Sequence, residues 1–319
     1  MRKTIFTFFL IIFTYGINAQ VLENKFSKIN ISETVIIGNS KQYIDIKGND
    51  EKNPILLILH GGPGKSLLPF APNFTNRLLD DFLVVNWDQR NTGETLKLNK
   101  SDNSIELLKS DALEVVQYLE KKYNKKKIFL LSHSWGSVMG FELAYKHPEL
   151  IAAYIAVSPV IDANESSNLF MKDLKSWANK TNNKLAIKEL NEVHLPFQTK
   201  NDFFYAQKWL FIHNGVQGAE TADFKISYYN WMDEWFPIWK ENAKTTIPSS
   251  YPSIDCPIYF FIGSSDNQSY HTLASKYYKQ LKSKNKKLYW FRKSGHTIFN
   301  TEPDKLQNLL IKIKNKNIA

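Results

Sequence analysis

Short apolar runs that alternate with helical patterns are the feature of this chain that most restricts its fold. The runs cover residues 54–60, 82–87, 127–134, 152–159 and 256–263. Between the second and third of them, apolar residues recur at helical spacing, at Ile105, Leu108, Ala112, Val115 and Leu119. Strands that are apolar on both faces are typical of the centre of a parallel sheet. The alternation therefore predicts an α/β fold, with a mostly parallel central sheet and helices on both faces.

The domain organisation follows from where this alternation stops. Residues 31–48 have the pattern of a β-hairpin around a Gly-Asn-Ser turn, and they precede the first apolar run. Residues 161–249 contain five of the eight tryptophans and no strand pattern, so they are predicted to be helical. We therefore expect a core of residues 20–160 and 250–319, which is interrupted by a helical, aromatic-rich cap at 161–249.

The first residues have the composition of a secretory signal peptide. Arg2 and Lys3 precede the apolar stretch Ile5–Phe13, and Ala19 is a small residue at a plausible cleavage point before Gln20. Residues 1–19 are therefore predicted to be a signal peptide, with export to the periplasm or the extracellular space. An uncleaved signal that anchors the protein in the membrane is the alternative. Cys256 is the only cysteine, so no intrachain disulfide can form.

The formal net charge of +10 raises the question of an anionic partner. The lysines are scattered or lie in short runs, at residues 125–127 and 282–287, where solvated turns are expected. Basic stripes interleaved with aromatic residues and nucleic-acid motifs are both missing from the sequence. We expect no nucleic-acid partner and no integral membrane partner, and the sequence does not set the oligomeric state. The spacing of the histidines with carboxylates or cysteines favours no metal, and no cofactor is expected.

Ser134 stands where a predicted strand, residues 127–134, meets a predicted helix. A nucleophile at such a strand-to-helix turn requires small neighbours two residues before and two residues after it. Gly136 meets this requirement, and Ser132 meets it in part, because it is small but is not glycine. Serine is also an ordinary helix-capping residue, so the turn alone leaves both interpretations open.

A nucleophilic serine needs a general base, and the base needs an acid that orients it. In this architecture they follow the serine in the order acid, histidine, each just after a strand. Asp266 follows the run at 256–263, and His296 follows the strand pattern that begins at Lys287. The remaining histidines are expected to be surface or packing residues, and His133 is expected to point away from Ser134. The oxyanion would be bound by two backbone N–H groups, from Trp135 and from the Gly-rich loop after residues 54–59.

Several motifs together resemble one family. His60-Gly61-Gly62-Pro63-Gly64, Asp88-Gln89-Arg90, Ser134-Trp135-Gly136, Asp266 and Gly295-His296 are similar to those of the α/β-hydrolases that include the prolyl aminopeptidases. The resemblance implies a serine hydrolase with Ser134, Asp266 and His296 as a catalytic triad. It also implies an oxyanion hole formed by Gly62 and Trp135.

The chain departs from this family at two positions. Asn91 follows Arg90 where the family usually has a glycine, and Ser132 replaces the first glycine of the G-x-S-x-G turn. Neither change removes a catalytic group, but both indicate a divergent member whose substrate can differ.

The substrate is less well defined by the sequence. An aminopeptidase must bind a free α-ammonium group, and Asp233 and Glu234, which lie between Trp231 and Trp235, are the candidates. The same pair also fits an acidic patch on the surface of an amphipathic helix. The aromatic cap equally suits a carboxylesterase or lipase-like hydrolase of small apolar esters. A third alternative is an inactive binding protein with this fold.

Overall fold

The computed structural model describes residues 28–317. The strands are β1 (Ile29–Ile37), β2 (Ser40–Gly48), β3 (Ile55–Leu59), β4 (Leu83–Asp88), β5 (Ile128–His133), β6 (Ile151–Val157), β7 (Ile258–Gly263) and β8 (Lys286–Phe291). The α-helices are α1 (Pro72–Thr75), α2 (Gly93–Leu98), α3 (Ile105–Tyr123), α4 (Ser137–Lys146), α5 (Ala163–Lys180), α6 (Lys184–Asn191), α7 (Lys200–His213), α8 (Ala222–Asn242), α9 (Ile247–Ser250), α10 (His271–Gln280), α11 (Ile298–Thr301) and α12 (Pro303–Asn317). The 3₁₀ turns are η1 (Leu68–Phe70), η2 (Asn76–Leu78), η3 (Ser134–Gly136) and η4 (Pro148–Leu150).

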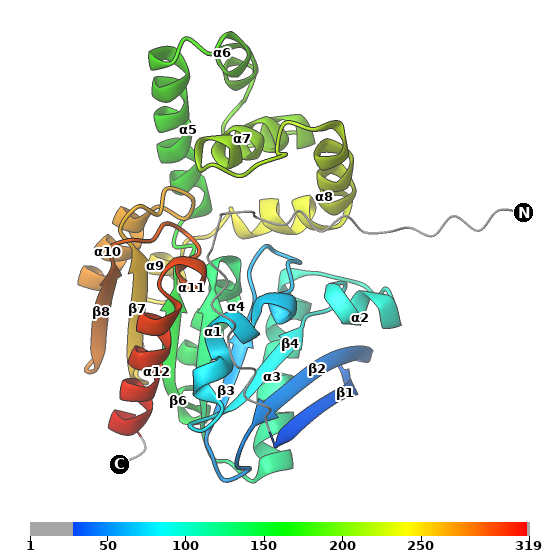
Figure 1. Ribbon diagram of the computed structural model, residues 1–319, viewed down its shortest axis with the longest axis vertical. Helices are drawn as coiled ribbons and strands as arrows, with labels where there is room; N and C mark the ends of the chain where they lie inside the picture. The colour runs from blue at the N-terminus through cyan, green and yellow to red at the C-terminus, as the bar shows by residue number, and fades with distance from the viewer. Residues whose placement is uncertain (1–27, 318–319) are drawn as a thin grey trace, which may run out of the picture. The chain divides into compact units, whose positions relative to one another are not determined.

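The strands form one eight-stranded sheet with the order β1-β2-β4-β3-β5-β6-β7-β8. β2 is antiparallel to both of its neighbours, and the strands from β4 to β8 pair in parallel. The predicted hairpin is confirmed as β1 and β2, and the predicted parallel α/β core is confirmed as well (Figure 1).

The central strands β3 to β7 are buried on both faces, as the apolar runs predict. One face packs against α1 and α12, through a core that includes Ile58, Leu131, Phe74 and Leu310. Figure 1 shows α1 and α12 over this face. On the other face, the ring of Phe141 from α4 packs edge-on against Tyr154, with the ring centroids 5.2 Å apart. The core on both faces fixes the parallel strands in place. Their carboxyl ends therefore lie in a row at the same edge of the sheet.

The chain divides into two compact units. The larger comprises residues 25–170 and 235–319, and it contains the whole sheet. The smaller includes residues 171–234 and contains α6 and α7 with parts of α5 and α8. Residues 161–249 carry helices and no strand, as the sequence predicts.

Aromatic packing and one carboxylate organise the helical unit. The rings of Phe204 and Tyr228, from α7 and α8, have centroids 5.9 Å apart. Asp202 closes a capping box with Thr199 at the start of α7. Burial tends to raise the pKa of Asp202, but its N–H and O–H donors, led by the His194 amide, lower the pKa to about 2.

The predicted signal peptide, residues 1–19, and its cleavage point at Ala19–Gln20 lie outside the described residues. Within residues 28–317, no helix combines the length and the hydrophobicity needed to cross a membrane.

Candidate active site

Ser134 lies on a tight turn at the carboxyl end of β5. Its φ angle is 53°, which is uncommon for a residue other than glycine, and η3 and α4 follow it directly. A Cβ atom on Gly136 would lie 2.4 Å from the carbonyl oxygen of Leu59. The turn therefore packs backbone against backbone at the end of β3, which explains why position 136 is glycine.

The structure brings Ser134, His296 and Asp266 together, although they are far apart in the sequence. Ser134 Oγ lies 2.8 Å from His296 Nε2. His296 Nδ1 lies 3.2 Å and 3.1 Å from the two carboxylate oxygens of Asp266. With the ring proton on Nδ1, His296 donates to Asp266 and its Nε2 accepts the hydroxyl proton of Ser134. This arrangement can remove a proton from a serine hydroxyl.

Asp266 is buried and accepts several hydrogen bonds besides that of His296. Its Oδ1 accepts from the amides of Gln268 and Ser269, at 2.9 Å and 3.2 Å, and its Oδ2 accepts from Ser269 Oγ at 2.8 Å. Burial alone would raise the pKa of Asp266, but His296 and these donors together hold it below its ordinary value. Asp266 is therefore ionised at neutral pH and can stabilise a positive charge on His296.

Ser269 is a member of this network that the sequence analysis missed. Besides Asp266 Oδ2, its hydroxyl oxygen lies 2.9 Å from the carbonyl oxygen of Ser158 and 3.3 Å from His296 Nδ1. The Ser166 hydroxyl donates to the Ser269 carbonyl at 3.0 Å. A hydroxyl residue three positions after the acid, in the same loop, is the signal that could have found it.

His133 contacts His296, the histidine that faces Ser134. Its Nε2 lies 3.2 Å from the carbonyl oxygen of His296, and the two ring centroids are 5.0 Å apart. Burial, with a smaller contribution from His296, lowers the pKa of His133 to about 3, so the ring is neutral at physiological pH. The ring of His133 thus holds the loop that carries His296, which the sequence did not indicate.

The glycine-rich loop after β3 lies against the Ser134 turn. A Cβ on Gly61 would lie 2.8 Å from the His133 carbonyl oxygen and 2.9 Å from Ser134 Cβ. Gly62 is exposed with a φ of 120°, and the Gly62–Pro63 peptide bond is cis. This loop therefore lies next to the serine, where a backbone donor is expected.

The loop is supported from two sides. A Cβ on Gly64 would lie 2.2 Å from the ring of Trp235, a buried residue that the sequence analysis did not connect with this loop. On the other side, the Gln89 amide donates to His60 Nε2 at 3.2 Å, and Gln89 Nε2 donates to the His60 carbonyl at 3.0 Å. Burial lowers the pKa of His60 against the opposing charge of Asp88, so its neutral ring can accept this bond.

The Asp88-Gln89-Arg90 segment is tied into the core by a buried ion pair. Arg90 donates from Nε and Nη2 to Asp111, at 2.7 Å and 2.8 Å, and both side chains are buried. Asn91, which replaces the family's glycine, has a φ of 55° and bonds through its side chain to both backbone groups of Ser101. Asparagine tolerates this left-handed conformation, so the turn is kept without glycine.

At the second departure from the family, where Ser132 stands in place of glycine, the structure supplies a hydrogen-bond partner for the serine. Ser132 Oγ lies 2.7 Å from the hydroxyl of Tyr154, and both residues are buried. A glycine at position 132 would leave the Tyr154 hydroxyl without this partner. The serine is therefore matched to a tyrosine on the neighbouring strand.

The sequence also predicted Trp135 as an oxyanion donor and Asp233 and Glu234 as substrate-binding residues. Trp135 is buried in η3, and its Nε1 has no hydrogen-bond partner among the described residues. Asp233 and Glu234 lie on α8 in the helical unit. Asp233 is 68% exposed and forms an ion pair with Lys200. Across residues 28–317, no group of three or more His, Cys, Asp or Glu side chains is arranged to hold a metal ion.

Comparison with known proteins finds a matching family and a relative that is similar over most of its length. Residues 54–303 match the family described as the alpha/beta hydrolase fold. The chain is 27% identical over 312 residues to the "Probable aminopeptidase YbaC" of Bacillus subtilis, with 88% of this chain and 95% of that protein covered.

Two solved structures illustrate the range of chemistry found on this fold. The proline iminopeptidase of Mycobacterium smegmatis has a TM-score of 0.64 at 15% identity, with 90% of this chain and 98% of that chain covered. A thermophilic esterase of Thermogutta terrifontis has a TM-score of 0.58 at 15% identity, with 91% of this chain and 100% of that chain covered. Both likenesses concern the fold.

The Ser132–Tyr154 pair generates a stability prediction. Ser132→Gly should lower the free energy of unfolding by roughly 1–3 kcal/mol, because it leaves a buried hydroxyl unsatisfied. In a Tyr154→Phe background, the same change should cost clearly less. Urea unfolding of the four proteins of this double-mutant cycle measures the difference. An equal cost in both backgrounds would show that the hydrogen bond does not stabilise the fold.

Proposed function

The chain belongs to the α/β-hydrolase family, and on this basis we propose that it is a serine hydrolase of the aminopeptidase type. Ser134 is the nucleophile, His296 is the general base and Asp266 orients and stabilises the histidine. The observation that carries the proposal is the 2.8 Å separation of Ser134 Oγ and His296 Nε2, with Asp266 on the other side of the ring.

The proposed reaction is acyl transfer in two steps. In the first, His296 Nε2 takes the Ser134 proton while Oγ forms a bond to the carbonyl carbon of the substrate. His296 then gives this proton to the leaving amine, the C–N bond breaks and an acyl-enzyme remains. In the second step, His296 takes a proton from water, which attacks the acyl-enzyme, and then returns a proton to Ser134. Asp266 stays ionised and stabilises the imidazolium in both steps.

The negative oxygen of each tetrahedral intermediate needs hydrogen-bond donors. We assign this role to the backbone N–H groups of Trp135 and Gly62. Trp135 directly follows the nucleophile on the tight turn, and Gly62 lies in the loop whose Gly61 contacts Ser134. The support of this loop by Trp235 and Gln89 favours a preorganised site, because donors that are already fixed cost no reorganisation during the reaction.

An aminopeptidase is favoured over other serine hydrolases by the aminopeptidase relative, which is matched over nearly all of its length. In this proposal, Asp233 and Glu234 are the candidate partners of the substrate's α-ammonium group. The Lys200–Asp233 ion pair bears on this role, since a substrate cation would have to compete with Lys200 for the carboxylate.

The second candidate function is a carboxylesterase with the same mechanism. The observation in its favour is the aromatic-rich composition of residues 161–249, which contain five of the eight tryptophans. Apolar acyl groups bind preferentially among aromatic and apolar side chains.

We also propose that the protein is exported. The basic, apolar and small-residue regions of residues 1–19 support secretion, with cleavage between Ala19 and Gln20. N-terminal sequencing of the protein from its source tests this assignment. A mature chain that begins at Gln20 supports cleavage, and a membrane-bound chain that retains residues 1–19 supports the anchor.

Substitution of the nucleophile tests the proposed chemistry and the substrate class together. Aminoacyl-naphthylamides, proline included, should be hydrolysed by the native protein, with N-acetylated versions and p-nitrophenyl esters of varied length as comparison substrates. Ser134→Ala should lower kcat on every hydrolysed substrate by about 10⁴-fold or more, because attack by Oγ is lost.

The controls separate the alternatives. Circular dichroism should show that Ser134→Ala keeps the native fold. Native turnover by this variant would disprove the nucleophile assignment. Activity on esters alone would replace the aminopeptidase by the esterase, and equal turnover of free and N-acetylated amides would remove the need for an ammonium-binding carboxylate.

Ser269 generates a separate prediction about catalysis. Its hydroxyl donates to Asp266 and is one of the groups that lower the pKa of this carboxyl. Ser269→Ala removes this donor, so Asp266 should be held less firmly beside His296. We therefore expect kcat to fall by about tenfold while KM changes little.

Two further variants serve as controls for Ser269. Ser269→Thr keeps the hydroxyl and should restore the native kcat. Ser264→Ala removes a hydroxyl of the same loop that bonds to the carbonyls of Phe291 and Arg292, and it should leave kcat unchanged. Native kcat in Ser269→Ala, in an enzyme that Ser134→Ala inactivates, would exclude this role while leaving the triad intact.

A further inference from the structure

The positive charge of the chain is concentrated near its C-terminus. Residues 271–319 contain twelve Lys and Arg and two acidic residues, a net charge of +10. This equals the formal net charge of the whole chain, so residues 1–270 are neutral overall. Solvated turns alone, which the sequence analysis expected for the lysine runs, do not account for such an imbalance.

The fold places the charged elements side by side at one edge of the sheet. β8 is the last strand in the order, and α10 and α12 flank it. Lys286 Nζ at the start of β8 donates to the carbonyl of Tyr278 in α10 at 2.7 Å. Lys305 at one end of α12 donates to the Trp290 carbonyl at 2.6 Å, and Lys316 near its other end donates to Asn285 Oδ1 at 3.3 Å. Lysine side chains near both ends of α12 therefore reach β8 and the residue before it.

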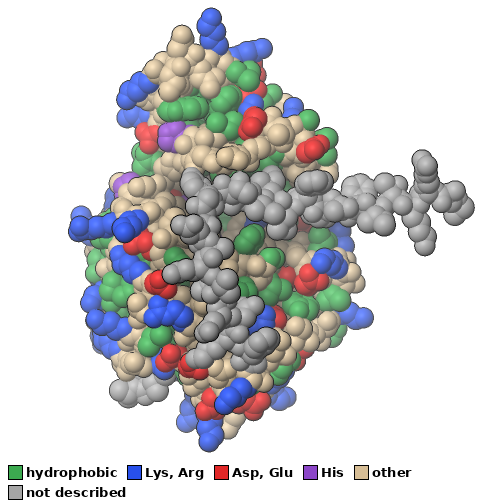
Figure 2. Space-filling view, viewed as in Figure 1, with side chains coloured by type: hydrophobic (Ala, Val, Ile, Leu, Met, Phe, Trp, Pro, Cys, Tyr) green, Lys and Arg blue, Asp and Glu red, His purple; other side chains and the backbone are tan. Residues whose placement is uncertain are grey.

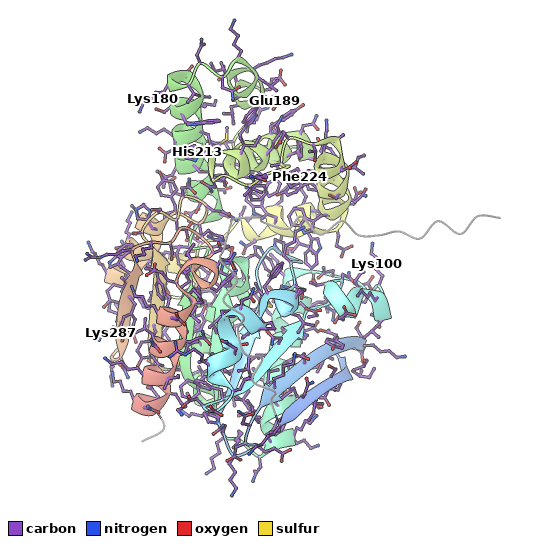
Figure 3. The ribbon with its side chains drawn as sticks, viewed as in Figure 1. Lys100, Lys180, Glu189, His213, Phe224 and Lys287 are labelled. Carbon is purple, nitrogen blue, oxygen red and sulfur yellow. The ribbon has the colours of Figure 1, made fainter. Side chains whose placement is uncertain are left out.

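Most of these cations face solvent. We use the name basic edge for the nine exposed ones, which are Lys276, Lys279, Lys282, Lys284, Lys287, Arg292, Lys293, Lys312 and Lys316. Figure 2 shows Lys and Arg side chains gathered on this side of the molecule, and Figure 3 labels Lys287 there. Both acidic residues of the segment have partners: Glu302 accepts from Ser294 Oγ at 2.7 Å, and Asp304 pairs with Arg77 at 3.0 Å. Cations therefore outnumber acidic side chains on the basic edge.

An exposed tryptophan lies within this surface. Trp290 on β8 is 37% exposed, and Arg292 and Lys293 follow it closely. An indole that is both apolar and able to donate a hydrogen bond is typical of side chains at the interface between a membrane and water.

Protection of the sheet edge explains only part of this pattern. Lysine on an edge strand prevents pairing with another sheet, and this reason suffices for Lys287. Protection against strand pairing does not explain the lysines of α10 and α12, because these helices lie outside the sheet. An exposed tryptophan on β8 would favour association with another molecule rather than prevent it.

We propose that the basic edge docks the protein on an anionic phospholipid surface. Juxtaposed lysines attract the negative charge of such a surface without specific geometry, and the attraction grows with each cation. Eight of the nine residues are lysine, which binds phosphate as a point charge, whereas the paired phosphate contacts of nucleic-acid recognition favour arginine. Trp290 adds an apolar group that can enter the headgroup layer.

Vesicle binding by the full chain tests the proposal. The protein should bind vesicles of phosphatidylcholine mixed with phosphatidylglycerol and should bind vesicles of phosphatidylcholine alone much more weakly. High salt should release it, because screening weakens exposed charges. The triple variant Lys282→Gln, Lys284→Gln, Lys287→Gln should weaken binding to the mixed vesicles by roughly a hundredfold.

A matched variant distinguishes binding that depends on the basic edge from binding that depends only on the net charge of the protein. Lys121→Gln, Lys126→Gln, Lys127→Gln removes the same charge from exposed lysines of α3 and the turn after it, and it should bind within about threefold of the native protein. Both variants should unfold at the native temperature. Equal binding by the two triple variants, or binding to the mixed vesicles that high salt does not weaken, would overturn the proposal. Tighter binding of the native protein to a DNA duplex than to the mixed vesicles would replace lipid by nucleic acid.

Discussion

The close contact between the Ser134 turn and the end of β3 is the constraint on which the candidate site depends. A Cβ on Gly136 would collide with the carbonyl oxygens of Leu59 and His60, and a Cβ on Gly61 would collide with the His133 carbonyl. Both sides of this contact are backbone, so neither can yield as a flexible side chain would. The contact holds Ser134 in its left-handed conformation and sets the glycine-rich loop beside it, so that the Ser134 hydroxyl and the candidate oxyanion donors are positioned together.

A second contact of the same kind positions the acid and the histidine. A Cβ on Gly263, at the end of β7, would lie 2.0 Å from the Gly295 carbonyl oxygen. The loop that carries Asp266 is thereby pressed against the loop that carries His296. Because the strands that precede these loops are parallel neighbours, both loops leave the sheet at the same edge. Ser269 then donates to the Asp266 carboxylate, and His133 Nε2 contacts the backbone carbonyl of His296.

The sequence was sufficient to predict the parallel sheet and the three residues that the structure brings together, because strand-end placement depends on local patterns. It was insufficient for contacts that depend on tertiary register. The Ser132–Tyr154 bond joins strands whose pairing no local pattern specifies, and Ser269 acquires its role only when Ser158 and His296 reach it. The partner of Asp233 could not be foreseen either, because Lys200 lies 33 residues away on another helix.

Strand β8 connects the candidate active site with the basic edge, and its geometry keeps them apart. Its carboxyl end leads into the loop of Ser294 and His296, where buried Phe291 anchors the strand in the core. Lys287 and Trp290 occupy exposed positions on the same strand. Lys287 and Phe291 lie on the same face of β8, so distance along the strand is what separates them, and at ~3.3 Å per residue it is roughly 13 Å. Substitution of Lys287 can therefore leave Phe291 and the loop of His296 in place.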